Sequence, residues 1–583
     1  MASLISSVAW VKRGIAVEQP TKYVLDEQEL ERVSALARIE LEDAKKELER
    51  AQKASASMGR GAEGDEADDA DEDEDEWVDE DEIENVKDTD DNAMDEDVPM
   101  DEEPAPSSEA IAGKPDGEDL AKYNLDNYDE EDDMPAMGPF SNIKGLTYYR
   151  NNDEDPYITL KEDEEDNERE ELQILPSDNL LVAAKTEDEI SQLEIYVYDE
   201  SEDNLYVHHD LMLPSFPLCL EWLDFPPISS PTAKTPDGQL RQFGNYIAVG
   251  TLEPEIEIWS LDVVEAMYPD MVLGRPDKTA AHVPTPLGTG KKKRKKTKHR
   301  EVSDAYHVDA VLSLSWNKTH RNLLASASAD RTVKLWDLSR DPTINGEGGE
   351  GEGALRSFSV HKDKVQSVQW NDKEPTVLLT GSYDRTVRTF DTRAPEAGVG
   401  ALVGADVEAL RWDPWEAHSF YVSLENGIVL NFDARTLPTN AATPSPARFT
   451  LSAHDGAVSA LDVNPHIPGC IATGGTDKVV KIWNIVEDAD FKKRQVSLVT
   501  SRDLGVGKVF SVAWSPDDPL TLAAAGSKAK LQVWEVGANA GARKVLGPKA
   551  AAAGRMVKEK QSGGVIGVAT DDEDSSGDEA GHE

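Results

Sequence analysis

Histidine, serine and aspartate side chains, the groups of a hydrolytic triad, recur at matched positions in the C-terminal half of this 583-residue chain. The sets consist of His307, Ser328 and Asp330; His361, Ser382 and Asp384; and His454 with Asp477. A catalytic triad occurs once in a protein and is recognised by its geometry. Because these residues recur with a repeat, we interpret them as structural.

The repeat is marked by aromatic residues. Five times in the last three hundred residues, an aromatic or apolar residue is followed twenty positions later by Trp or Phe. The pairs are Trp316 and Trp336, Trp370 and Phe390, Trp412 and Phe432, Val463 and Trp483, and Trp514 and Trp534. Short alternating runs joined by turn residues, such as VLSLSW and VKLWD, are typical of antiparallel sheet. A period of roughly 40–45 residues with a Trp-Asp ending indicates a propeller blade.

The same frame occurs seven times, which predicts an all-β fold, a seven-bladed β-propeller over residues 175–547. The blades are expected near residues 180–213, 217–274, 311–360, 365–404, 407–452, 458–500 and 508–547. The innermost strand of the first blade comes from residues 1–16, and the rest of that blade begins near Asn179. We therefore expect the N-terminal strand to close the ring, and deletion of residues 1–12 to open it.

A long acidic insert, residues 17–174, separates the two parts of the first blade. The chain has a net charge of −55, and residues 17–170 hold 55 acidic and 15 basic side chains. Residues 26–53 have apolar positions at spacings of three and four, which predicts an amphipathic helix. Residues 63–103 hold 25 acidic side chains against one lysine. Such a tract cannot bury enough apolar surface to fold, so we expect a largely disordered insert, and a disordered acidic tail at 548–583.

A basic run, KKKRKKTKHR, stands out in this acidic chain. Its cationic residues are Lys291, Lys292, Lys293, Arg294, Lys295, Lys296, Lys298 and Arg300. Such a run is typical of a nuclear-localisation signal or of an arm that contacts phosphates. The alternative is a solvated charge run, but eight cations in ten residues favour nuclear import first and RNA contact second.

Other charged residues allow weaker interpretations. Arg331, Arg385 and Lys478 follow the turn aspartate in three blades and could meet an acidic peptide or RNA at the channel mouth, although ordinary turn polarity is the favoured interpretation. The acidic tract could attract histones or ribosomal proteins, or simply keep the chain soluble. Ser575 and Ser576 have acidic residues three positions later, which suits an acidophilic kinase.

Several classes of site and location are disfavoured by the sequence. The two cysteines, Cys219 and Cys470, lie in apolar stretches and are expected to be buried free thiols. No Cys/His cluster has metal-ligand spacing, and there is no P-loop or dinucleotide fingerprint, so we expect no metal and no cofactor. The N-terminus lacks the apolar run of a signal peptide, and no segment is long enough to span a membrane. We therefore expect a soluble protein of a reducing compartment, with no membrane partner.

These motifs resemble a known family. LLASASADRTVKLWD and VLLTGSYDRTVRTFD follow the pattern of WD-repeat propellers, and the resemblance covers roughly residues 175–547 plus the N-terminal strand. A closer resemblance is to the periodic tryptophan protein one family. It is carried by SSVAWVKRG (6–14), LAKYNLDNYDEED (120–132), DPYITLK (155–161), PSDNLLVAA (176–184), YVHHDLMLPSFPL (206–218), GNYIAVG (244–250) and the Lys-rich run.

The resemblance implies a structural role for the repeated polar sets, which in WD repeats form hydrogen bonds around buried tryptophans. The tryptophans concerned are Trp259, Trp336, Trp483 and Trp534. The sequence also departs from the pattern. Phe390 and Phe432 lack an indole N–H, Gly475 stands where a serine would complete the sixth-blade set, and the fifth blade lacks the Asp-Arg turn. We expect these blades to be less rigid.

The resemblance further implies a nuclear and nucleolar protein that assists early assembly of the large ribosomal subunit and pre-rRNA processing. We therefore expect a non-enzymatic scaffold whose partners are ribosome-assembly proteins and pre-rRNA. One alternative is a chromatin reader that binds histones and acts on rRNA gene transcription. Another is a substrate adaptor of a ubiquitin ligase, for which the sequence shows no docking signature. An enzyme is the most distant alternative.

Overall fold

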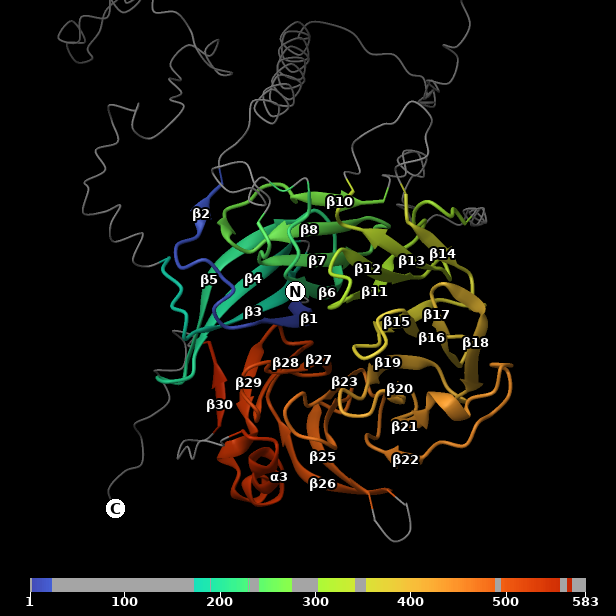
Figure 1. Ribbon diagram of the computed structural model, residues 1–583. Helices are drawn as coiled ribbons and strands as arrows, with labels where there is room; N and C mark the ends of the chain where they lie inside the picture. Colours follow the sequence, from blue (N-terminus) through green and yellow to red (C-terminus); the bar gives the residue numbers. More distant parts are fainter. Residues whose placement is uncertain are drawn as a thin grey trace, which may run out of the picture. The chain divides into compact units, whose positions relative to one another are not determined.

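Seven four-stranded antiparallel sheets stand around a central axis in the computed structural model, with their innermost strands gathered at the centre (Figure 1). The structure describes residues 3–23, 172–188, 190–228, 230, 241–274, 302–340, 353–487, 494–555 and 564–568. All of these belong to one compact unit that joins Met1–Val24 with Lys161–Glu583. The seven-bladed propeller expected from the sequence is confirmed. The predicted helix at 26–53 and the acidic tract lie outside the described residues.

Each blade is a simple meander, so its strands can be listed by their place in the sheet. The innermost strands are β1 (Ser3–Val11), β6 (Pro217–Leu223), β11 (Val311–Trp316), β15 (Val365–Trp370), β19 (Val407–Trp412), β23 (Ala460–Val463) and β27 (Val509–Trp514). The second strands are β3 (Asn179–Glu187), β7 (Tyr246–Thr251), β12 (Leu323–Ser328), β16 (Val377–Ser382), β20 (Ser419–Leu424), β24 (Cys470–Gly474) and β28 (Thr521–Gly526).

The outer half of each blade follows the same order. The third strands are β4 (Ile190–Asp199), β8 (Ile256–Ser260), β13 (Val333–Asp337), β17 (Thr386–Asp391), β21 (Ile428–Asp433), β25 (Val479–Glu487) and β29 (Leu531–Glu535). The outermost strands are β5 (Asn204–Leu213), β10 (Met271–Leu273), β14 (Arg356–Phe358), β18 (Ala394–Leu402), β22 (Phe449–Ser452), β26 (Arg494–Asp503) and β30 (Val565–Gly567). We call the face with the turns between second and third strands the upper face, and the opposite one the lower face.

The periodic aromatic residues lie between blades. Trp336, Phe390 and Trp534 are each at most 3% exposed and belong to apolar clusters that join residues of neighbouring sheets. The alternation of each strand creates these clusters, because one set of side chains on a strand faces the previous blade and the other set faces the next. These aromatic residues are therefore buried between the blades of the ring, as the sequence predicted.

The innermost strands have a free edge toward the centre, and the sequence supplies caps for it. A side chain near the lower end of one innermost strand accepts a hydrogen bond from a backbone N–H of the next blade. These bonds run from Trp316 to Glu221 (3.0 Å), from Trp370 to Ser315 (3.1 Å), from Trp412 to Gln369 (2.6 Å) and from Trp514 to Asp462 (2.8 Å). An unpaired strand edge exposes backbone polar groups, so these polar side chains both satisfy the edge and join successive blades.

The first blade closes the ring through its N-terminal strand. β1 pairs with β3 in antiparallel register, with Trp10 opposite Leu181. On its other side, β1 contacts the seventh blade, where the backbone N–H of Val8 donates to Ser511 Oγ (3.2 Å) and Trp10 Nε1 donates to the carbonyl of Ala513 (3.0 Å). The expected pairing of the N-terminal strand with a distant segment is confirmed.

Arg13 fastens the same junction on the lower face. Its guanidinium donates to Asp518 (2.7 Å) in the seventh blade and to Glu200 (3.1 Å) in the first. Its backbone N–H donates to Asp517 (3.0 Å). The chain then runs to β2 (Thr21–Lys22), which pairs with β9 (Val263–Val264) of the second blade. The segment that closes the ring therefore reaches three blades.

The two ends of the insert meet at one point. The backbone N–H of Ile174 donates to the carbonyl of Glu18 (3.0 Å), and Gln173 Nε2 donates to the Glu18 carboxylate (2.7 Å). The described residues on the two sides of residues 24–171 therefore lie side by side.

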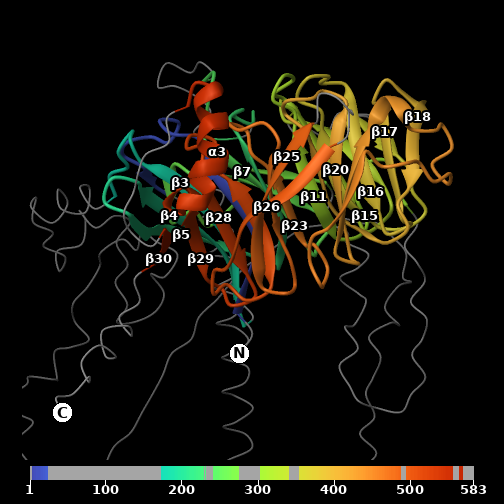
Figure 2. The same ribbon diagram turned by 90° about the horizontal axis from the view of Figure 1, so that it is seen from below.

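The predicted end of the propeller at residue 547 is wrong, and residues 548–583 are not all tail. Helix α3 (Ala540–Ala552) packs beside β26, with Leu546 and Ala550 buried in the core cluster between the sixth and seventh blades (Figure 2). β30 then completes the seventh sheet. The small-residue composition of α3 and the three-residue length of β30 give weak signals, which explains the error.

Candidate functional site

The polar set of the third blade is a closed chain of hydrogen bonds. His307 Nδ1 lies 2.9 Å from Asp330 Oδ2, and its Nε2 lies 2.7 Å from Ser326 Oγ. Trp336 Nε1 donates to the same hydroxyl (2.8 Å). Asp330 also accepts from the Thr332 hydroxyl (2.6 Å). The set links three segments: the connection that arrives from the second blade, strand β12 and strand β13. It therefore fixes their order.

The hydroxyl in this chain is not the one that the sequence indicated. Ser328 bonds instead to the Asp309 carbonyl (2.9 Å) and accepts from the Asp330 N–H, which caps the turn. Ser382 has the same turn role in the fourth blade, where Thr380 contacts His361 Nε2 (2.8 Å). Positions 326 and 328 lie two apart on one strand, so both hydroxyls face the same side and only the register distinguishes them.

The sixth-blade set is complete, which corrects a second expectation. Thr473 Oγ1 lies 2.8 Å from His454 Nε2 and accepts from Trp483 Nε1 (2.9 Å). His454 Nδ1 lies 2.9 Å from Asp477. Gly475 is therefore not a missing member of the set. It adjoins the His454 ring so closely that an added Cβ would lie 2.7 Å from Nδ1.

Burial and protonation make the third-blade set unsuitable for hydrolysis. His307 is 1% exposed and Ser326 is fully buried, so no substrate reaches the hydroxyl in this arrangement. Burial lowers the pKa of His307, which keeps the imidazole neutral. Burial opposes ionisation of Asp330, but hydrogen bonds from His307 and Thr332 outweigh it and lower its pKa to about 2. A neutral histidine held by an ionised aspartate stabilises the turn.

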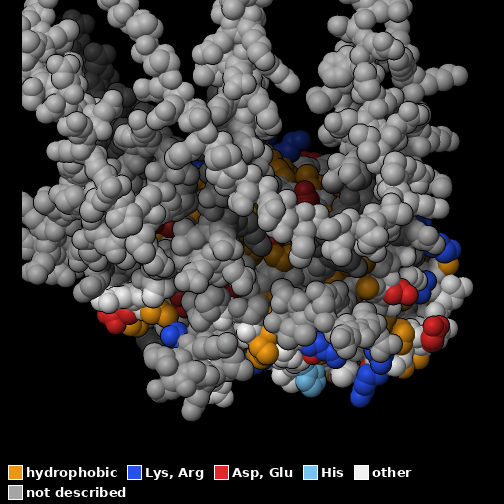
Figure 3. Space-filling model, turned by 90° about the horizontal axis from the view of Figure 1, so that it is seen from above, with side chains coloured by type: hydrophobic (Ala, Val, Ile, Leu, Met, Phe, Trp, Pro, Cys, Tyr) orange, Lys and Arg blue, Asp and Glu red, His pale blue; other side chains and the backbone are white. Residues whose placement is uncertain are grey.

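The cations after the turn aspartates lie at the turns of the upper face. Arg331, Arg385 and Lys478 all have left-handed backbones, with φ of 72°, 63° and 71°, and all are exposed. Arg385 Nε is bonded to Asp406 (3.0 Å), so its charge is matched locally. Figure 3 views the ring from above Figure 1, across its rim, and the described surface on that side carries both acidic and basic side chains. The contact role of these three cations stays a prediction.

The basic run, residues 291–300, lies outside the described residues, and so do Ser575 and Ser576. Its connection leaves the second blade at Gly274 and returns at Val302. A fully buried lysine, Lys334, binds the returning end. Its ammonium donates to the carbonyl of Ser303 (2.6 Å) and to Ser357 Oγ (2.9 Å), and burial lowers its pKa. The basic run therefore ends next to a segment that is fixed to the third blade.

A second group that the sequence analysis missed lies on the lower face between the fifth and sixth blades. Trp415 is 42% exposed, but its Nε1 donates to the carbonyl of Asn464 (3.1 Å) in the next blade. In the third and fourth blades, Asn317 and Asn371 make the corresponding bonds to the next blade. Asp413 replaces that asparagine in the fifth blade, and Trp415 supplies the bond between blades instead.

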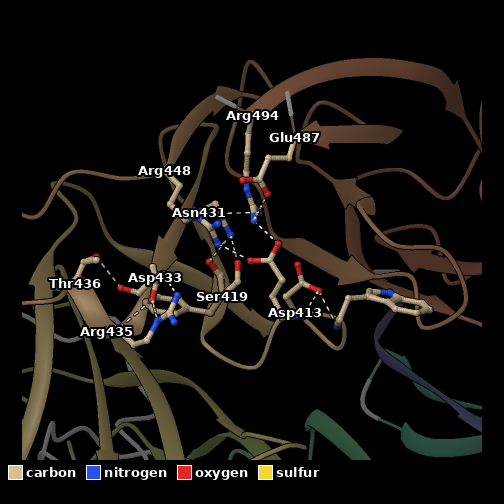
Figure 4. Close-up of polar contacts among 12 residues, drawn as sticks. Asp413, Ser419, Asn431, Asp433, Arg435, Thr436, Arg448, Glu487 and Arg494 are labelled. Carbon is tan, nitrogen blue, oxygen red and sulfur yellow. Dashed lines mark hydrogen bonds and ion pairs between the residues drawn. The ribbon is translucent and has the colours of Figure 1, made fainter. Parts of the chain in front are cut away.

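Charged residues converge beside Trp415, and most of them are labelled in Figure 4. Glu416 accepts from Arg448 (2.6 Å) and from Arg494, whose guanidinium also contacts Asn431. Glu487 lies 3.8 Å from Arg494. The two arginines and two glutamates balance in charge, so the group favours a structural or protein-contact role over anion binding. An aromatic residue outside the twenty-residue spacing was the one available sequence signal.

The described residues contain no group of three or more His, Cys, Asp or Glu that could hold a metal ion. In the same part of the chain, no helix has the length and apolar character needed to cross a membrane. Cys219 and Cys470 are free thiols.

Comparison with known proteins identifies the family. A model of the WD domain, G-beta repeat, matches residues 303–337, 353–391 and 446–484. An uncharacterized WD repeat-containing protein of Schizosaccharomyces pombe is 40% identical over 93% of this chain and 91% of its own length. Periodic tryptophan protein 1 of Saccharomyces cerevisiae is 34% identical over 93% of this chain and 89% of its length. The Drosophila melanogaster homolog is 28% identical over 71% and 79%.

The chain belongs to the periodic tryptophan protein 1 family. Its members are WD-repeat proteins, so the propeller and the family agree. The name also describes the ring, because the tryptophans recur at equivalent places in successive blades.

Proposed function

We propose that this chain is a non-catalytic scaffold in early assembly of the large ribosomal subunit and in pre-rRNA processing. Its partners are ribosome-assembly proteins and pre-rRNA within a pre-ribosomal particle, in the nucleus and nucleolus. The observation that carries the proposal is family membership, because identity to Periodic tryptophan protein 1 extends over 93% of this chain. The proposal requires neither a cofactor nor a membrane.

The way the ring uses its polar residues supports a binding role. The His–Asp sets are bonded within blades, and the polar side chains near the centre are bonded between blades. The faces and the rim remain for partners. A rigid platform that holds two partners at once gains affinity, because the second contact becomes intramolecular.

The charged segments extend the reach of this platform. The basic run at 291–300 is proposed to contact rRNA phosphates or an import receptor, since lysine and arginine bind phosphates through charge. The acidic tract at 63–103 is proposed to hold basic ribosomal proteins or histones. The bond of Lys334 to Ser303 supports the first role, because it gives the basic run a fixed base near the upper face.

The test compares three full-length tagged proteins in nuclear extract treated with deoxyribonuclease. They are the wild type, a variant with the eight cations of 291–300 changed to alanine, and a charge-matched control with Lys and Arg exchanged at the same positions. The wild type and the control should recover pre-rRNA and assembly factors, and the alanine variant should recover less of both. Crosslinked RNA read at nucleotide resolution then locates the contact.

Recovery of nucleosomes without pre-rRNA by the wild type would instead favour a histone-binding protein that acts on rRNA gene transcription. Normal nucleolar accumulation and normal RNA recovery by the alanine variant would contradict both roles of the basic run. These two results are separate, because the first concerns the scaffold and the second only one of its arms.

A further inference from the structure

The outermost strand of the first blade, β5, has an unpaired edge. β5 runs for ten residues and pairs with β4 on one side. Among the described residues, no strand or loop backbone bonds to its other side, and its one side-chain bond outside the sheet joins His208 to the carbonyl of Leu172 (2.9 Å). The strand has a register shift near His208 and is regular from His209 to Leu213.

The edges of the other two long outermost strands, β18 and β26, are protected. The edge of β18 is bonded by the loop of the fifth blade, where Gly400 N–H donates to Pro438 O (2.9 Å) and Leu402 N–H donates to Thr443 O (3.3 Å). β26 contains two arginines and lies beside α3. Covering an edge, or placing cations on it, prevents pairing with other chains. β5 has neither device, since it contains no lysine, arginine or proline.

Apolar side chains are exposed on the β5 sheet. Val207 and Met212 are 42% and 56% exposed, and Ile190 at the start of β4 is 59% exposed. The register places Val207 opposite Tyr196 and Met212 opposite Gln192, so all of them share the side that faces the seventh blade. That blade ends in β30, which has three residues and pairs only with Gln532–Trp534. Among the described residues, this short strand therefore leaves Ile190, Val207 and Met212 exposed.

The sector around β5 is strongly acidic. Residues 172–274, which form most of the first two blades, hold 19 acidic and 3 basic side chains, a net charge of −16. Residues 301–547 hold 31 and 26, a net charge of −5. Asp210 lies on the exposed side of β5, between Val207 and Met212. An excess of one sign on one sector attracts the opposite charge and repels its own.

The acidic segments of the chain and its basic run do not match this surface. Residues 17–170 carry a net charge of −40, and residues 569–583 contain seven acidic side chains and no lysine or arginine. The basic run at 291–300 has the right sign but no apolar side chain to cover Val207 and Met212. The occupant that fits is a separate chain with both properties.

We propose that β5 binds an extended segment of a partner protein in which apolar residues and lysine or arginine take turns at every second position, so that both kinds of side chain lie on one face of the segment. The segment adds a fifth strand to the first blade. Its backbone pairs with His209–Leu213, its apolar side chains cover Val207 and Met212, and its cations approach Asp210. This mode of recognition takes affinity from backbone bonds and specificity from alternate side chains. The inference concerns the ring alone and does not depend on a role in ribosome assembly.

The test uses purified full-length protein and the fluorescent ten-residue peptide VTKTVTKTVT, which places valine and lysine on one face of an extended strand, with binding measured by anisotropy. The double variant Asp210→Lys, Met212→Lys should bind at least tenfold more weakly. Both positions are exposed, so the fold should survive, which an unchanged melting temperature confirms. The matched control is Leu498→Lys, an exposed apolar residue of β26, which should bind like the wild type.

Three further peptides separate the contributions. A peptide with methyl groups on alternate backbone nitrogens should lose binding, because it cannot pair with the strand edge. The peptide VTETVTETVT, with glutamate in place of lysine, should not bind. The sequence KKKRKKTKHR should bind more weakly than VTKTVTKTVT. Equal binding of the methylated peptide, of the glutamate peptide or of KKKRKKTKHR would overturn the proposal, and so would wild-type affinity of the double variant.

Discussion

Removal of β1 should open the ring, and the structure gives the size of the effect. Ile5 and Val11 are fully buried, and Val8 and Trp10 are 7% exposed. Burial of Ile5, Val8 and Val11 contributes about 1.5–3 kcal/mol each, and loss of Trp10 costs about 3–5 kcal/mol, which together give roughly 8–14 kcal/mol. A whole domain is stable by only about 5–15 kcal/mol. Deletion of residues 1–12 should therefore consume most or all of the folding free energy.

The assay is denaturant unfolding followed by tryptophan fluorescence, with the deleted protein compared with the wild type. The deletion should lower the midpoint strongly or abolish the transition, and Trp10→Ala alone should lower the unfolding free energy by about 3–5 kcal/mol. Lys12→Ala is the control, because Lys12 is exposed beside the same strand. A synthetic peptide of residues 1–14 added to the deleted protein should restore part of the midpoint. A deleted protein that unfolds at the wild-type midpoint would refute closure by β1.

Three other changes test the interior. Trp336→Ala should cost roughly 3–5 kcal/mol of unfolding free energy in a urea titration, and a cost below about 1 kcal/mol would mean that the residue is not a buried pin. Thr473→Val should cost roughly 2–4 kcal/mol, because it leaves buried ring nitrogens of His454 and Trp483 without a partner, and an unchanged unfolding free energy would contradict the completed sixth-blade set. Burial raises the pKa of Glu257 to about 7. The folded state therefore favours its protonated form, so its contribution is full below about pH 4.5 and is lost as pH rises to about 7. Between pH 5 and pH 8 the unfolding free energy of the wild type should fall by up to roughly 3 kcal/mol through this group, and Glu257→Gln should remove this fall. An unchanged pH dependence of unfolding in the variant would contradict the prediction.

The architecture was predictable because one chemical signal repeats. Most blades repeat three features: a tryptophan or phenylalanine, an alternating run before it and a turn aspartate. Together these features specify the strand, its buried face and the turn. Agreement between these levels makes a fold prediction secure. The split first blade was predictable for the same reason, since SSVAWV near the N-terminus has the pattern of an innermost strand. The closing strand could therefore be recognised although its partner begins at Asn179.

The details of the site were less predictable, because they depend on register and not on residue type. Ser326 and Ser328 have identical chemistry on one side of β12, and only the hydrogen bonds show that Ser326 joins His307 while Ser328 caps the turn. The repeat pattern indicates Gly475 as the incomplete position of the sixth-blade set, whereas Thr473, two residues earlier, makes the bond to His454. Trp415 stands outside the repeat, and its bond to the next blade becomes visible only when Asp413 is seen to replace an asparagine donor.

The residues whose chemistry is most evident in the sequence form hydrogen bonds within the ring itself. His307, Asp330 and Trp336 bond to one another inside a blade, and Ser315 and its equivalents satisfy the inner strand edges. A buried polar group that lacks a hydrogen-bond partner destabilises the fold. A fold with many free strand edges therefore needs polar side chains that bond to its own backbone. Partners can bind where backbone groups of the ring are not bonded by the ring's own side chains. In the described part of the chain, the clearest such place is β5, a long outer strand whose backbone has no cover and whose exposed side chains are apolar and acidic.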